Sequence, residues 1–107
     1  VAGSIVASDD VTAYSDARLK HDVTPTGNLI EKVKKIRVVN YKLNGDRNER
    51  PRTGIIAQDL IDIFPQYVHG SHDDYYSINY GQMTAVCIKA IQELSDRVDK
   101  LEKMLMG

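Results

Sequence analysis

The strongest pattern in the chain is an apolar seam over about residues 79–106. Apolar or small side chains recur there in alternating steps of four and three, with charged residues between them. This is the heptad spacing of a coiled coil, in which the a and d positions face partner helices. It predicts a long C-terminal helix whose interface is formed by Tyr80, Thr84, Cys87, Ile91, Leu94, Val98, Leu101 and Leu105.

The seam leaves two alternatives open. A single amphipathic helix packed on its own domain has a similar periodicity, and the mixed seam residues do not decide the number of strands. Charged residues flank the seam. Glu93 and Arg97 are predicted to pair along the outside of the helix, and Arg97 at a g position also faces an e-position Glu102 of another chain.

Shorter elements precede this helix. Leu29, Ile30, Val33 and Ile36 share one helical face, directly after a breaker at 25–28, which predicts a first amphipathic helix. Residues 38–43 read as a strand that the pair Asn44-Gly45 ends in a turn. After a charged loop, residues 53–56 are the predicted returning strand.

A second set of short elements follows. Residues 57–64 are predicted to form a short helix, which Pro65 ends. Residues 66–69 and 75–78 are the predicted arms of a second hairpin around 70–74. The small, polar and β-branched residues 1–14 resemble a strand or a fibre tail. The fold class predicted is α+β: short β-hairpins and helices with a long C-terminal helix.

The length of the chain and its net charge limit the kinds of partner that it is expected to bind. A domain of 107 residues buries only about 60 to 70 per cent of its unfolded surface, and oligomerisation would relieve that shortage. The net charge is -1, and acidic residues interrupt the basic residues between 32 and 52. We therefore expect a solvated surface and no nucleic-acid partner.

Other features point to a soluble, cytosol-compatible protein. No apolar run approaches the roughly 18 residues that a membrane span needs, and no signal peptide is recognisable at Val1. The lone Cys87 excludes an intrachain disulfide. No membrane partner is expected.

The candidate chemistry lies near the front of the chain, where Ser15 and Lys20 stand five positions apart. A serine becomes a nucleophile when a base accepts its proton, and a neutral, desolvated lysine is one such base. On spacing alone, a turn serine beside a solvated lysine is the commoner explanation. Ser15 also lies where a core-poor segment meets the folded part, and a chain can be cut there without unravelling either side.

The segment Ser15-Asp16-Ala17-Arg18-Leu19-Lys20 resembles the opening of the C-terminal intramolecular chaperone domain of phage tailspikes and tail fibres, the peptidase S74 family. The resemblance continues through 39–41, 54–60, 64–65 and 76–80 and into the terminal helix. It implies a homotrimer in which the long C-terminal helices form a trimeric coiled coil. The trimer assists assembly of the preceding triple-stranded β fibre and then removes itself by a serine–lysine dyad. The same domain type occurs in a membrane-bound transcription factor of animals.

The resemblance implies specific roles. Ser15 matches the nucleophile and Lys20 the general base. Gln58 is a candidate for orienting the scissile peptide or for donating to an oxyanion, and a purely structural role of its amide is an equally good interpretation. Residues 1–14 would be the end of the released fibre and residues 15–107 the chaperone and autoprotease. The process would take place in the host cytoplasm during phage assembly. The alternative is a trimerisation module that never cuts.

The resemblance places the cut between Ser15 and Asp16. Attack of the serine hydroxyl on its own carbonyl would close a strained four-membered ring, whereas attack on the Tyr14 carbonyl closes a five-membered ring and cuts before the serine. Cutting after Ser15 requires attack from another chain or by an activated water. The sequence leaves both bonds open.

No metal or cofactor is expected. His21, His69 and His72, together with Asp73 or Asp74, lack the fuller ligand set of a zinc site and are read as turn residues. Cys87 at a d position is read as a small apolar side chain of the seam.

Overall fold

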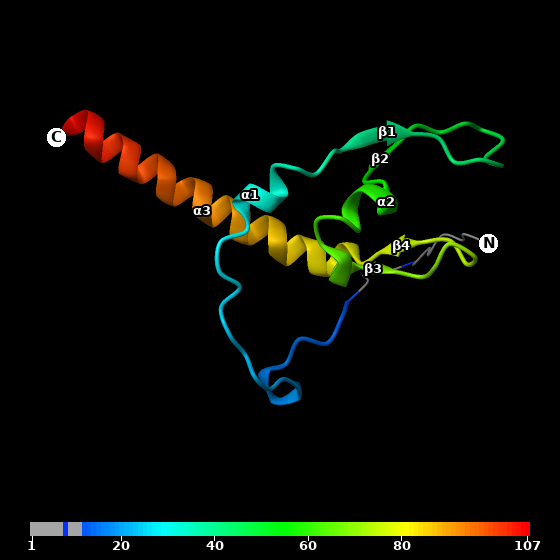
Figure 1. Cartoon of the computed structure of the whole chain (residues 1–107), viewed down its shortest axis with the longest axis horizontal. Helices are drawn as coiled ribbons and strands as arrows, with labels where there is room; N and C mark the ends of the chain where they lie inside the picture. The colour runs from blue at the N-terminus through cyan, green and yellow to red at the C-terminus, as the bar shows by residue number, and fades with distance from the viewer. Residues whose placement is uncertain (1–7, 9–11) are drawn as a thin grey trace.

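A computed structural model describes Ser8 and residues 12–107. One long helix, α3, forms the C-terminal arm of the molecule, and α1, α2 and the two hairpins gather around its N-terminal half and beyond it (Figure 1). Much of the predicted fibre stub, residues 1–7 and 9–11, lies outside the described residues. The elements in chain order are η1 (Ala17–Leu19), α1 (Ile30–Val33), β1 (Val39–Tyr41), β2 (Arg52–Gly54), α2 (Ala57–Leu60), η2 (Pro65–Tyr67), β3 (Val68–His69), β4 (Ser77–Ile78) and α3 (Tyr80–Met106).

The bounds of α3 confirm the predicted C-terminal helix. The Asn79 side chain caps its start by accepting a hydrogen bond from the Gln82 backbone N–H at 3.0 Å. At its end the Gly107 N–H donates to the Lys103 carbonyl. The local sequence therefore fixes the start of the helix.

Both predicted hairpins are present as two-stranded antiparallel sheets. Strand β1 pairs with β2, with Asn40 opposite Thr53, and β3 pairs with β4, with Val68 opposite Ile78. Both hairpins are shorter than predicted. The returning strand of the first ends at Gly54, and the arms of the second have two residues each because Gln66 and Tyr67 belong to η2. The charged loop after β1 has its own order, because the Asp46 carboxylate accepts hydrogen bonds from the backbone N–H groups of Asn48 and Arg50.

The two predicted short helices are only four residues long. Each is followed by a turn that contains tighter i→i−3 bonds, for example from the Ile36 N–H to the Val33 carbonyl and from the Ile63 N–H to the Leu60 carbonyl. The apolar residues of both predicted helices nevertheless pack in or against the core, as the pattern predicts. The core cluster consists of Leu60, Phe64, Met83 and Val86, with α1 packed against it and against α3.

The single chain exposes a large surface. Its accessible area is 9576 Å² for a mass of 12.0 kDa, against about 6,000 Å² for a compact monomer of that mass. The radius of gyration is 17.8 Å, against about 13 Å for a compact domain of similar length. The C-terminal half of α3 causes much of this elongation, since it projects beyond the domain (Figure 1). Among the described residues no helix has the length and apolarity to cross a bilayer.

Candidate functional site

The structure brings Ser15 and Lys20 together. Lys20 Nζ donates a hydrogen bond to Ser15 Oγ at 2.7 Å. One turn of 3₁₀ helix, η1, separates them, closed by bonds from the Leu19 N–H to the Asp16 carbonyl and from the Lys20 N–H to the Ala17 carbonyl. A five-residue spacing thus becomes a direct contact through one capped turn.

Asp16 holds this turn. Its side chain caps η1 by accepting a hydrogen bond from the Arg18 backbone N–H at 2.9 Å, and it also accepts bonds from the Arg18 guanidinium, the shortest at 2.8 Å. The guanidinium bonds, followed by the backbone bond, hold the pKa of the Asp16 carboxyl below its ordinary value. At neutral pH the cap is therefore a carboxylate.

The dyad and its surroundings are open to solvent. Every residue from 12 to 28 is exposed, including both members of the pair. The large apolar side chains of the segment, Tyr14, Leu19 and Val23, are also exposed, Tyr14 to 94%. A lysine must lose its proton before it can accept one, and exclusion of water favours the neutral form. The single chain provides the geometry of a dyad without that exclusion.

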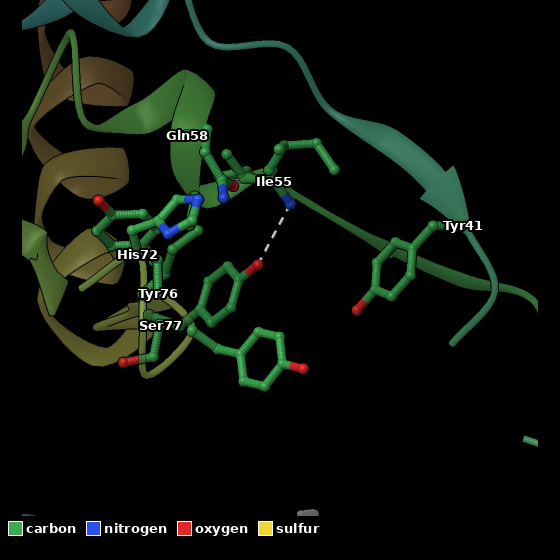
Figure 2. A pocket seen from close by; sticks show the side chains of 11 residues that line it. Tyr41, Ile55, Gln58, His72, Tyr76 and Ser77 are labelled. Carbon is green, nitrogen blue, oxygen red and sulfur yellow. Dashed lines mark hydrogen bonds between the residues drawn. The ribbon is translucent and has the colours of Figure 1, made fainter. Parts of the chain in front are cut away.

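Gln58 lies apart from the dyad. It is on α2 and lines a cavity of about 800 Å³ together with Tyr41, Tyr76 and Tyr80 (Figure 2). None of the residues 14–20 lines this cavity. In the single chain the predicted supporting residue and the predicted dyad are two separate sites.

The long helix has two apolar faces. One face, formed by Met83, Val86, Ala90 and Glu93, is buried against the domain. The predicted seam is a different face and is exposed: its large residues Tyr80, Ile91, Leu94, Val98, Leu101 and Leu105 are between 48% and 87% exposed, and Cys87 is also exposed. The helix therefore packs on its own domain and retains an uncovered heptad seam.

The charged pairs predicted along the outside of this helix are wrong for Glu93 and Arg97. Glu93 is only 8% exposed, and its carboxylate accepts a hydrogen bond from the Leu29 N–H at 2.9 Å. Arg97 pairs with Glu31 of α1 at 3.2 Å. The buried face of α3, which includes Glu93, lies toward α1. Glu93 and Arg97 therefore bind groups of the domain and not each other. Tyr80 also contacts its own domain, because its hydroxyl accepts a hydrogen bond from the Ile55 N–H at 3.2 Å.

The histidines do not gather. His21 lies 3.9 Å from Asp22 and His72 lies 3.7 Å from Asp73, all strongly exposed. Among residue 8 and residues 12–107, no group of three His, Cys, Asp or Glu side chains is placed to hold a metal ion.

Comparison with known proteins is decisive for the family. The model of the peptidase S74 family, described as the chaperone of endosialidase, matches residues 15–69, which begin at Ser15 and include the dyad and Gln58. The chain belongs to this family. The resemblance to the chaperone domain of tail fibres is confirmed.

Several relatives align with nearly the whole chain. The chain is 33% identical over 98% of its length to myelin regulatory factor homolog 1 of Caenorhabditis elegans, of which it covers 12%. It is 31% identical over 94% of its length to long tail fiber protein Gp37 of Enterobacteria phage K3, of which it covers 9%. For the corresponding protein of Enterobacteria phage Ox2 the identity is 37%, over 87% of this chain and 40% of the relative. The chain thus spans a minor part of each relative's length.

Proposed function

We propose that this domain drives trimerisation and folding of a phage tail fibre or tailspike and then releases itself by serine–lysine autoproteolysis beside Ser15. The observation that carries the proposal is the 2.7 Å contact between Lys20 Nζ and Ser15 Oγ, inside the region that the peptidase S74 family matches. The tail-fibre relatives support an assembly role. The partners are two further copies of the chain and the fibre segment that precedes the domain.

The surface of the chain supports assembly. Its exposed area exceeds that of a compact monomer of equal mass by about 3,600 Å², and obligate interfaces bury about 2,000–5,000 Å² in total. The exposed seam of α3 offers apolar a and d positions for this purpose. Three copies packed along these seams form the proposed coiled coil.

In the proposed reaction neutral Lys20 takes the proton of the Ser15 hydroxyl while Ser15 Oγ bonds to a carbonyl carbon. The C–N bond of that peptide breaks, and the departing amine receives the proton from Lys20. Water then hydrolyses the ester, which restores the serine hydroxyl and leaves a carboxylate. A cut before Ser15 follows from attack on the Tyr14 carbonyl. A cut after it follows from attack on the Ser15 carbonyl by another chain or by water.

Assembly would gate this reaction. Both members of the dyad are exposed in the single chain, so the lysine is hydrated until a partner covers it. Packing of further copies would exclude water and favour the neutral amine. Cleavage would then report that the fibre has assembled.

The test uses the domain joined to its upstream segment. The parent should release a fragment of about this domain's mass on denaturing electrophoresis, and Ser15→Ala and Lys20→Ala should not, while both remain trimeric. Lys20→Arg keeps a positive charge but removes the base, so it should also stay intact. Cleavage of these variants at the parental rate would refute the dyad. A parent that trimerises and stays whole would support the alternative, a module that never cuts. Mass spectrometry of the fragment gives the bond, because its first residue is Ser15 or Asp16.

The gate has its own test. Leu94→Asp with Leu101→Asp places two charges on the seam, whereas Gln92→Asp with Met106→Asp adds the same charge off the seam. The first pair should give monomers that are not cleaved, and the second should give cleaved trimers. Normal cleavage in a monomer would refute the gate.

A further inference from the structure

The cavity at the start of α3 is open and largely apolar. The rings of Tyr41, Tyr76 and Tyr80 and the side chain of Ile55 line it, and Gln58 contributes an amide to the same wall (Figure 2). Its volume of about 800 Å³ is within the range of sites that hold a ligand or a peptide segment. His72 and Ser77 add two further polar side chains to the lining. A cavity with mainly apolar walls and a few polar groups suits a short peptide with one bulky side chain.

The walls are built into the fold. Gly54 lies between two of the tyrosines, and a Cβ there would lie 3.0 Å from Tyr80 Oη and 3.2 Å from Tyr41 Cε1. The absence of a side chain at Gly54 therefore lets both rings close on the same strand. The bond between the Ile55 N–H and the Tyr80 hydroxyl fixes that ring. Contacts among β1, the end of β2 and the start of α3 thus define the cavity in the single chain.

The dyad segment, in contrast to the walls of the cavity, packs against no other described part of the domain. It is an ordered turn with exposed apolar side chains, Leu19 to 69% and Val23 to 80%. These residues lie outside the seam of α3, so a coiled coil alone leaves them uncovered. In Figure 1 the turn η1 hangs on the side of α3 opposite to β1 and β2. The cavity of the same chain is lined by other segments and by none of the residues 14–20.

We propose that this cavity receives the dyad segment, residues 14–20, of a second copy of the chain, so that Gln58 of one copy serves the Ser15–Lys20 pair of another. The inference rests on the proposed function. Three observations carry it: the excess exposed surface needs a second copy, the apolar side chains of the segment need a partner, and the cavity begins at Tyr80, the first residue of the seam. The surface of the cavity is therefore continuous with the proposed helical interface.

The connection between the dyad and α3 is long. It is tied to α3 at Leu29, whose N–H donates to Glu93. Leu29 lies fourteen positions after Ser15, and an extended chain of that length reaches about 45 Å. Docking would cover Ser15 and Lys20 with apolar walls. The Gln58 amide N–H would donate to the carbonyl oxygen of the bond that breaks, where charge develops during attack.

The test is complementation in mixed trimers. Gln58 is exposed, so Gln58→Ala should preserve the trimer while slowing cleavage by about 10²–10³-fold, the usual cost of an oxyanion donor. Gln66→Ala, at an exposed glutamine outside the cavity, should cleave at the parental rate. When tagged Gln58→Ala chains are coexpressed with Ser15→Ala chains, the inactive copy supplies the missing amide. The tagged chains should then be cleaved at close to the parental rate in mixed trimers.

The outcomes separate the two claims. If Gln58→Ala homotrimers cleave as fast as the parent, Gln58 has no role and the inference is wrong. If they are slow and mixing does not restore cleavage, the amide acts within its own chain and docking in a second copy is wrong. Both results leave the dyad intact. Failure of the proposed function itself would appear instead as an uncleaved parent or a cleaved Ser15→Ala variant.

Discussion

The carboxylate of Glu93 in α3 accepts a hydrogen bond from the backbone N–H of Leu29 at 2.9 Å, across 64 positions of the chain. Leu29 is the residue at which the exposed stretch 12–28, which carries the dyad, ends and α1 begins. The bond therefore fixes the downstream end of this stretch to the helix that carries the seam. Reaction site and assembly helix are joined within one chain.

This anchor gives a prediction about stability. Glu93→Ala leaves the Leu29 N–H without its acceptor in a partly buried place, and we expect a loss of about 1–3 kcal/mol in the free energy of unfolding. Glu93→Gln keeps an oxygen acceptor and should lose less. Chemical denaturation at one fixed chain concentration measures both. Equal losses in the two variants would show that the charge, and not the hydrogen bond to Leu29, is what matters.

The turn of the dyad gives a prediction about rate. Asp16→Ala removes the cap of η1, whose loss typically costs about 1 kcal/mol, so the competent turn should be about fivefold less populated and fragment release about fivefold slower. Asp16→Asn retains a good capping side chain and loses only an exposed ion pair with Arg18, which is worth little. It should stay near the parental rate. Cleavage of Asp16→Ala at the parental rate would contradict a role for the cap.

The same turn shows what a sequence pattern can and cannot provide. Periodicity predicted α3, both hairpins and the exposed seam, since these follow from side-chain spacing and from turn residues such as Gly45. Periodicity did not distinguish the seam from the buried face of α3. Glu93 stands among charged residues and was assigned to the outside, although Met83, Val86 and Ala90 already place its face against the domain. An aspartate directly before a short turn is a capping signal that could have indicated η1.

The position of Gln58 could not have been inferred in the same way. The family match covers Gln58, Ser15 and Lys20, and the fold of one chain holds only the last two in contact. Whether separate sites meet depends on how copies pack, which the spacing of residues in one chain does not encode.

The ion pair between α1 and α3 gives a prediction about pH. The hydrogen bond from Arg97, together with the charge of Lys34, holds the pKa of the Glu31 carboxyl below its ordinary value of 4.5. A carboxyl with a lowered folded-state pKa contributes its full stabilisation above the unfolded value and loses it as the pH falls through the folded value. A double-mutant cycle with Glu31→Gln and Arg97→Gln should therefore show favourable coupling at pH 7 and none well below pH 4. Coupling that persists in acid would contradict the carboxylate assignment.

The two hairpins provide a matched pair of glycine substitutions, one in each connecting loop. Gly70 has φ of +95°, and a Cβ there would collide with the carbonyl oxygen of Tyr75, whereas Gly45 has φ of +86° with no atom within 4 Å of a Cβ. Gly45→Ala should cost only the backbone strain, about 1–2 kcal/mol. Gly70→Ala adds a clash with backbone that cannot rotate away, so its loss should be larger by about 1–3 kcal/mol. Hydrogen exchange at Ile78, opposite Val68 in the hairpin, should accelerate for Gly70→Ala alone, because displaced Tyr75 loosens the β3–β4 arm that lines the cavity. Equal losses in denaturation and equal exchange in both variants would show that the contact at Gly70 does not hold the hairpin.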